Sequence, residues 1–105
     1  MARMYNPPHP GCLLQEGLEA LGISAREFAR HIGVSPSTVT RVLREESPIT
    51  PDMAVRISAA IEGPSPETWL AMQADYDAWQ AEHRTDISHI SRIVPKVTTS
   101  IQPAV

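Results

Sequence analysis

Arginines and hydroxyl side chains are concentrated in one stretch of this 105-residue chain, between Ser24 and Arg44. The stretch carries four arginines against one glutamate, whereas residues 45–86 carry nine acids against two arginines. A guanidinium group can place paired donors on a phosphate or on the O6 and N7 atoms of guanine, and a hydroxyl can donate or accept. The net charge of −3 does not exclude a nucleic-acid partner, because phosphate contacts need only local positive charge.

The side chains best placed to contact DNA lie on a short helix that is expected to begin at Pro36. Its buried side is apolar and consists of Val39, Val42 and Leu43. Ser37 and Arg41 are four residues apart and share another face, so they are the first candidates for reading base edges. A guanine contact by Arg41 would be worth about 1–3 kcal/mol of discrimination. The complete predicted DNA-binding set is Ser35, Ser37, Thr38, Thr40, Arg41 and Arg44.

Each role has a plainer alternative. Arg41 could be an ordinary solvated arginine, although its place on the helix favours a DNA contact. Ser35 is expected to cap its own helix and also to touch phosphate, and Thr40 and Arg44 suit phosphate contacts that position the protein without reading sequence. Arg26 and Arg30 precede this helix and are individually less favoured as DNA contacts.

The elements that must position these side chains are two helices joined by a tight turn. Ser24 and Glu27 have the spacing of a capping box, which starts the first helix. Gly33 can adopt the positive φ that a turn requires, and Ser35 followed by Pro36 starts the second helix. The first helix buries Phe28, Ala29 and Ile32. Two short helices with such a turn are typical of the helix-turn-helix DNA-binding motif.

Three further helices are expected around this pair. The first opens at Pro10 and Gly11 and carries an apolar stripe of Leu14, Leu18 and Leu21. The signature of a hydroxyl cap followed by proline recurs at Thr50 and at Ser65, and the last helix should end near His83. No strand is indicated. The sequence therefore predicts an all-α, five-helix fold with an N-terminal arm (1–9), a helix-turn-helix domain (10–83) and a C-terminal tail (84–105).

Aromatic and apolar side chains recur along one side of the last helix, at Trp69, Met72, Tyr76 and Trp79. Trp69 is expected in the core, since a tryptophan at helical spacing is usually buried. Met72, Tyr76 and Trp79 exceed what a small core can cover, so they are predicted to pair with the same helix of a second copy. Such a dimer would place two recognition helices about one DNA turn apart.

The tail is too apolar for a segment that stays free in solvent, because it contains Ile87, Ile90, Ile93 and Val94. Asp86 could cap a short turn or helix that carries them. Two alternatives are open: the segment packs back on its own domain, or it contacts a partner and becomes ordered there. Partner contact is favoured.

Other classes of protein have little support in the sequence. The four histidines are scattered, and the single cysteine, Cys12, excludes an internal disulfide and a zinc site of the cysteine type. The chain shows no nucleophile elbow, no glycine-rich phosphate loop, no long apolar run and no apolar signal-peptide centre. We therefore expect a cytoplasmic binding protein rather than an enzyme, with no metal, no cofactor and no membrane contact.

Four strings within residues 9–94 carry a resemblance to a known family, and they read HPGCLLQEGLEALGISAREFARHIGVSPSTVTRVL, ITPDMAVRISAAI, SPETWLAMQADYDAWQAE and DISHISRIV. They resemble the HigA/VapI family of bacterial addiction-module antitoxins, within the Cro/C1-repressor type of helix-turn-helix. One departure is visible, because many members of the family have Asn-Gly after the recognition helix where this chain has Glu45 and Glu46. Two acids there would repel nearby phosphates.

The resemblance implies a lambda-repressor-like fold and a homodimeric antitoxin. Such a protein binds a small toxin, typically an mRNA-cleaving ribonuclease encoded beside it, and represses the shared promoter at a palindromic operator. A stand-alone repressor without a toxin is the first alternative, because the same DNA-binding helix would serve it. An interaction module that has lost DNA binding is the second, and Arg41 with the local positive charge argues against it.

Overall fold

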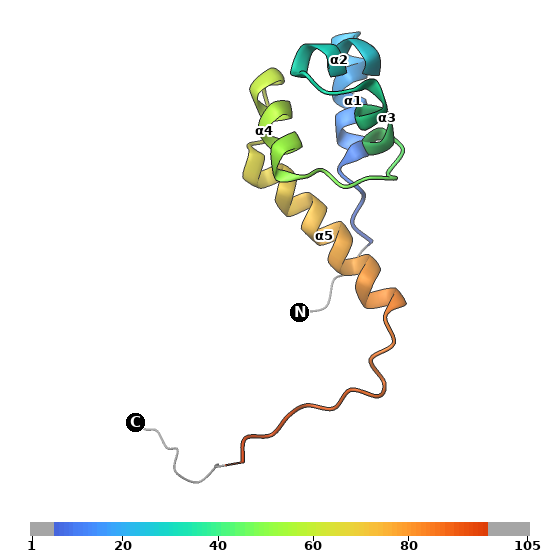
Figure 1. The fold of residues 1–105 in the computed structure, drawn as a ribbon, viewed down its shortest axis with the longest axis vertical. Helices are drawn as coiled ribbons and strands as arrows, with labels where there is room; N and C mark the ends of the chain where they lie inside the picture. Colours follow the sequence, from blue (N-terminus) through green and yellow to red (C-terminus); the bar gives the residue numbers. More distant parts are fainter. Residues whose placement is uncertain (1–5, 97–105) are drawn as a thin grey trace, which may run out of the picture.

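The computed structural model describes residues 6–96, which contain five α-helices and no strand (Figure 1). The helices are α1 (Gly11–Leu21), α2 (Ala25–Ile32), α3 (Pro36–Leu43), α4 (Pro51–Ala60) and α5 (Pro66–Arg84). The predicted all-α, five-helix fold is confirmed. None of the five has both the length and the apolar character that crossing a membrane requires.

Hydroxyl caps begin four of the five helices, as the sequence predicts. The side chains of Ser24, Ser35, Thr50 and Ser65 each accept a hydrogen bond from the backbone N–H three residues later. At Ser24 the capping box is complete, because Glu27 Oε1 accepts from the Ser24 N–H at 3.0 Å. Each such cap is worth about 1 kcal/mol of helix stability.

A single core lies where α1 to α4 meet the first turns of α5. It contains Leu14, Leu18, Phe28, Ala29, Ile32, Val39, Val42, Ile49, Met53, Ala54, Ile57 and Trp69. The expected burial of Trp69 is confirmed. Leu21 was expected on the buried stripe of α1, but its side chain is 56% exposed. The reason is that α1 ends at Leu21, and the chain turns away at Gly22 with a φ of +71°.

The N-terminal segment is part of the domain from Pro7 onward, which shortens the arm that the sequence predicts. Pro7, His9 and Pro10 are buried. His9 Nδ1 accepts a hydrogen bond from the Gly11 N–H at 2.9 Å, and its ring meets the ring of Tyr76 edge-on with centroids 4.9 Å apart. His9 therefore fixes the entry of the chain against α5. The rest of the arm, residues 1–5, lies outside the described residues.

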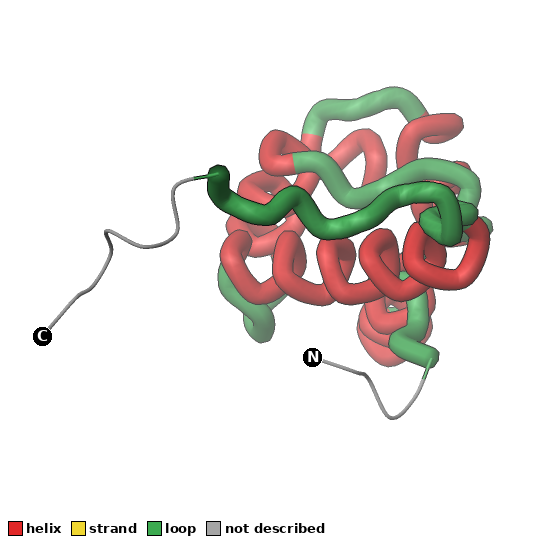
Figure 2. Tube along the Cα trace, turned by 90° about the horizontal axis from the view of Figure 1, so that it is seen from below, coloured by secondary structure: helices red, strands yellow, loops and turns green. Residues whose placement is uncertain are grey.

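The tail leaves the end of α5 and continues away from the helices (Figure 1). In the view from below, along the long axis, the tail therefore crosses in front of the helices as a loop (Figure 2). Asp86 Oδ1 accepts hydrogen bonds from the backbone N–H and the hydroxyl of Ser88, at 3.0 and 2.7 Å, and these bonds lower the pKa of the Asp86 carboxyl. A turn follows, closed by a hydrogen bond from the Ile90 N–H to the Ile87 carbonyl. The short turn that the sequence suggests after Asp86 is confirmed, and it does not continue into a helix within residues 85–96.

The four large apolar side chains of the tail do not pack back on the domain. Ile87, Ile90 and Val94 are 63%, 64% and 69% exposed, and Ile93 is 92% exposed. The sequence leaves two alternatives open for this segment. The first, in which it packs back on its own domain, is not observed in the single chain. The remaining tail, residues 97–105, is outside the described part of the chain.

Candidate nucleic-acid interface

The turn between α2 and α3 is closed by hydrogen bonds to one carbonyl. The N–H groups of Gly33 and Val34 both donate to the Ala29 carbonyl, at 2.9 and 3.0 Å. Gly33 has a φ of +79°, a conformation that a side chain disfavours. Val34 is half-buried and packs against the core. The predicted turn is confirmed, and it fixes where α3 begins.

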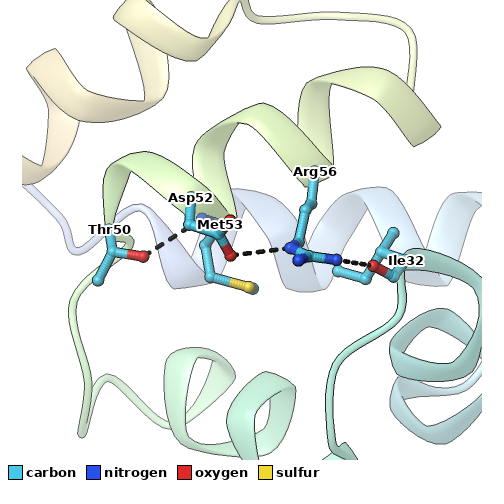
Figure 3. Close-up of polar contacts among 5 residues, drawn as sticks. All are labelled: Ile32, Thr50, Asp52, Met53 and Arg56. Atoms are coloured by element: carbon cyan, nitrogen blue, oxygen red, sulfur yellow. Dashed lines mark hydrogen bonds and ion pairs between the residues drawn. The ribbon is translucent and has the colours of Figure 1, made fainter.

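Arg56 of α4 holds this turn from outside the motif (Figure 3). Its Nη1 donates to the Ile32 carbonyl at 2.6 Å, and its Nε donates to Asp52 Oδ2 at 2.8 Å. The Ile32 carbonyl belongs to the last turn of α2, where carbonyls lack partners within the helix and a cation is favoured. Arg56 therefore links α4 to the turn that positions α3.

Hydroxyl groups gather at the start of α3. Ser35 Oγ lies 2.9 Å from Thr38 Oγ1 and 3.2 Å from Ser37 Oγ, and it accepts from the Thr38 N–H at 3.4 Å. The expected capping role of Ser35 is confirmed. Three of the predicted DNA-binding side chains are thus brought together at one exposed helix end, where free N–H groups and the helix dipole also favour a phosphate.

The outward face of α3 carries the predicted arginines. Val39 and Val42 are 0% and 1% exposed on the opposite face, and Leu43 is half-buried beside them. Arg41 and Arg44 are exposed, and their guanidinium groups make no hydrogen bond or ion pair within residues 6–96. Both charges are therefore available to an anionic partner.

Residues beside this face differ in how well they can reach a partner. Thr40 is half-buried, so less of it is available than of Arg41. Arg26 and Arg30 of α2 line a shallow hollow together with Val34 and Pro36 at the start of α3. The two α2 arginines therefore lie beside the start of α3, on the same hollow as Pro36.

An acidic residue, Glu45, occupies the left-handed position at the C-terminal end of α3. The Glu45 N–H donates to the Val42 carbonyl and the Glu46 N–H donates to the Arg41 carbonyl, at 3.0 and 2.8 Å, which is the Schellman pattern. Glu45 has a φ of +64°, in the left-handed region where glycine or asparagine is usual. Both acids are exposed at this end of the recognition helix.

Gln73 of α5 holds the connection that follows. It is 5% exposed, and its Oε1 accepts a hydrogen bond from the Ile49 N–H at 2.8 Å, while its Nε2 donates to Asp77 Oδ1 at 3.0 Å. This buried contact ties the segment between α3 and α4 to α5. Sequence reasoning did not find Gln73 or Arg56, since each binds a backbone group 24 residues away.

The predicted dimerisation residues are only partly covered within one chain. Met72 packs against the core, and Tyr76 meets the ring of His9. Trp79 stacks on His83 of its own helix, with ring centroids 3.7 Å apart. All three side chains are half-buried, so each keeps surface that a second copy can cover.

Comparisons with known proteins agree with this geometry. The Helix-turn-helix family model matches residues 14–72. The chain is 41% identical over 92 residues to the uncharacterized HTH-type transcriptional regulator YddM of Escherichia coli strain K12, covering 88% of this chain and 97% of that protein.

Two solved structures with DNA are similar over most of this chain. The antitoxin GraA in complex with its operator is 34% identical with a TM-score of 0.77, and the match covers 90% of this chain and 99% of that one. The Pseudomonas aeruginosa antitoxin HigA with the higBA promoter is 32% identical with a TM-score of 0.75, covering 87% and 99%. The chain belongs to the helix-turn-helix family of the Cro/C1 type, in the group that contains the HigA antitoxins.

Proposed function

We propose that this chain is the antitoxin of a type II toxin–antitoxin module, which neutralises a small ribonuclease-type toxin and represses its own operon as a homodimer on a palindromic operator. The observation that carries the DNA-binding part is the exposed face of α3, with the Ser35 hydroxyl cluster at its start and with Arg41 and Arg44 unpaired within residues 6–96. The similarity of nearly the whole fold to operator-bound antitoxins supports the same role.

In this proposal Arg41 and Ser37 read base edges in the major groove, and the other polar residues position the protein on phosphates. Arg26 and Arg30 join Thr40 and Arg44 as phosphate contacts. Glu45 and Glu46 place two negative charges at the end of α3. Because these charges repel phosphates, the connection after α3 does not contact the DNA backbone. The role is binding rather than catalysis, and it is carried out in the cytoplasm.

The salt dependence of binding tests how many of these contacts form. The logarithm of the affinity should fall with the logarithm of salt concentration by about 0.9 for each phosphate neutralised. A few arginines per copy predict a shallow slope. A slope as steep as that of a repressor with about ten phosphate contacts would mean that other segments of the chain also bind DNA.

A growth assay tests the antitoxin part. The small reading frame beside this gene is expressed alone and together with this chain. Growth arrest by that frame and recovery with this chain are the expected results. If no such frame exists, or if it does not arrest growth, the chain is a stand-alone repressor.

A further inference from the structure

An apolar groove lies between α1 and the connection from α4 to α5, with an open volume of about 340 Å³. Leu13, Ile61 and Trp69 line it, and Leu13 is 38% exposed. The charged residues among its lining are Glu16 and Glu62, both exposed to solvent. The groove therefore suits an apolar segment that carries positive charge.

Gly17 gives an independent sign that something approaches α1 at this groove. It lies in the middle of α1 and lines the groove, where glycine costs about 1 kcal/mol of helix stability relative to alanine. Its φ is not positive, and a Cβ built on it would meet no atom of the described chain within 4 Å. Nothing within the described residues of one chain requires a glycine here. Gly17 is half-buried, and the absence of a side chain there suits close approach by another backbone.

The tail has the chemistry that this groove fits. Its apolar side chains are largely exposed, with Ile93 at 92%. Beyond Asp86, the charged residues of the described tail are Arg92 and Lys96, both basic. An apolar strip flanked by two cations thus complements an apolar groove flanked by two carboxylates.

The described tail of one chain does not reach the groove of the same chain, whose lining contains no described residue after Trp69. The tail runs away from its own helices beyond the end of α5 (Figure 1). The groove lies at Trp69, which is about 22 Å back along α5 from Arg84 at 1.5 Å per residue. Antiparallel pairing of two α5 helices through Tyr76 and Trp79 brings the end of one α5 to the beginning of the other, beside that copy's groove.

We infer that the segment 87–96 of one copy docks in the groove of a second copy, with its isoleucines on the apolar lining and its cations toward Glu16 and Glu62. The inference rests on the homodimer of the proposed function. Exchange of the two tails covers the exposed isoleucines on both copies. It also adds a second contact between the copies beside the α5 pair.

Disulfide trapping in the full chain tests this docking. Two differently tagged copies are expressed together in a Cys12→Ser background, one with Glu16→Cys and the other with Ile93→Cys. Gentle oxidation should give a cross-linked product that carries both tags on a denaturing gel. Glu46→Cys replaces Glu16→Cys as the control, because Glu46 is also exposed but lies at the end of α3. Equal yields from the two positions, or no product with Glu16→Cys, would overturn the inference.

Gly17→Leu provides the matched variant, since leucine fills the groove and favours the helix. This change should lower the cross-linking yield at least tenfold without lowering the thermal midpoint of unfolding. An unchanged yield would also overturn the inference. Operator binding is measured on the same samples. A chain that cross-links but does not bind the DNA upstream of its own gene would contradict the proposed function and leave the docking intact.

Discussion

Removing the guanidinium group of Arg56 should loosen the junction between α2 and α3. The bond from Arg56 to the Ile32 carbonyl is short, at 2.6 Å, and its donor is charged. Hydrogen bonds to charged groups contribute about 1.5–3 kcal/mol. Because the Arg56 side chain is 39% exposed, we expect the lower end of that range. The pair with Asp52, whose side chain is 70% exposed, should add less than about 0.5 kcal/mol.

Arg56→Met is therefore expected to lower the free energy of unfolding by about 1.5–2 kcal/mol, and Asp52→Asn by about 0.5 kcal/mol or less. Methionine keeps the apolar stem of the side chain, so the change removes mainly the charged donor. Urea unfolding followed by circular dichroism at pH 7 measures both values. If Arg56→Met costs no more than Asp52→Asn, the contact with Ile32 does not hold the turn and the reasoning is refuted.

Three further predictions follow from single residues. Glu45→Gly should raise the free energy of unfolding by about 1 kcal/mol, because it relieves a positive φ; Glu46→Gly, where φ is not positive, is the control and should not stabilise. Trp69→Phe should cost much less than the roughly 3–5 kcal/mol of Trp69→Ala, since the buried indole N–H has no partner among the described residues and no hydrogen bond is lost; similar costs for the two would contradict this. The hydrogen bonds from Ser24 lower the pKa of the Glu27 carboxyl, so its contribution is complete above the ordinary carboxyl pKa and is lost as pH falls through the lowered value. The stability difference between the wild type and Glu27→Ala, from unfolding at pH 7 and pH 3, should accordingly shrink at the lower pH, and a constant difference would argue against a charged cap.

The sequence predicts well those parts of the fold that are determined by interactions between residues close together in the chain. Ser24, Ser35, Thr50 and Ser65 bond to a backbone N–H only three residues away, so the sequence itself shows where α2 to α5 begin. Helical spacing likewise predicts that Val39 and Val42 are buried and that Arg41 faces outward. The candidate DNA-binding surface follows from these two facts.

What the sequence does not predict depends on distant partners or on helix ends. Arg56 and Gln73 bond to backbone groups far away in the chain, and backbone groups look alike at every residue. The burial of His9 depends on Tyr76 of α5, which no local pattern links to it. Leu21 has the spacing of a buried residue, but α1 stops there and the side chain stays exposed.

Operator binding by Arg41→Ala tests the central claim most directly. The affinity of the wild type and the variant is measured for a duplex taken from upstream of this gene and for a scrambled duplex, with Arg84→Ala, an exposed arginine at the end of α5, as the control. In a homodimer on a palindromic operator this change removes two guanine contacts, each worth about 1–3 kcal/mol, which predicts binding of the upstream duplex about 30-fold weaker or more, with a much smaller change on the scrambled duplex. An Arg41→Ala chain that binds the upstream duplex as tightly as the wild type would contradict the assignment of α3 as the helix that reads DNA.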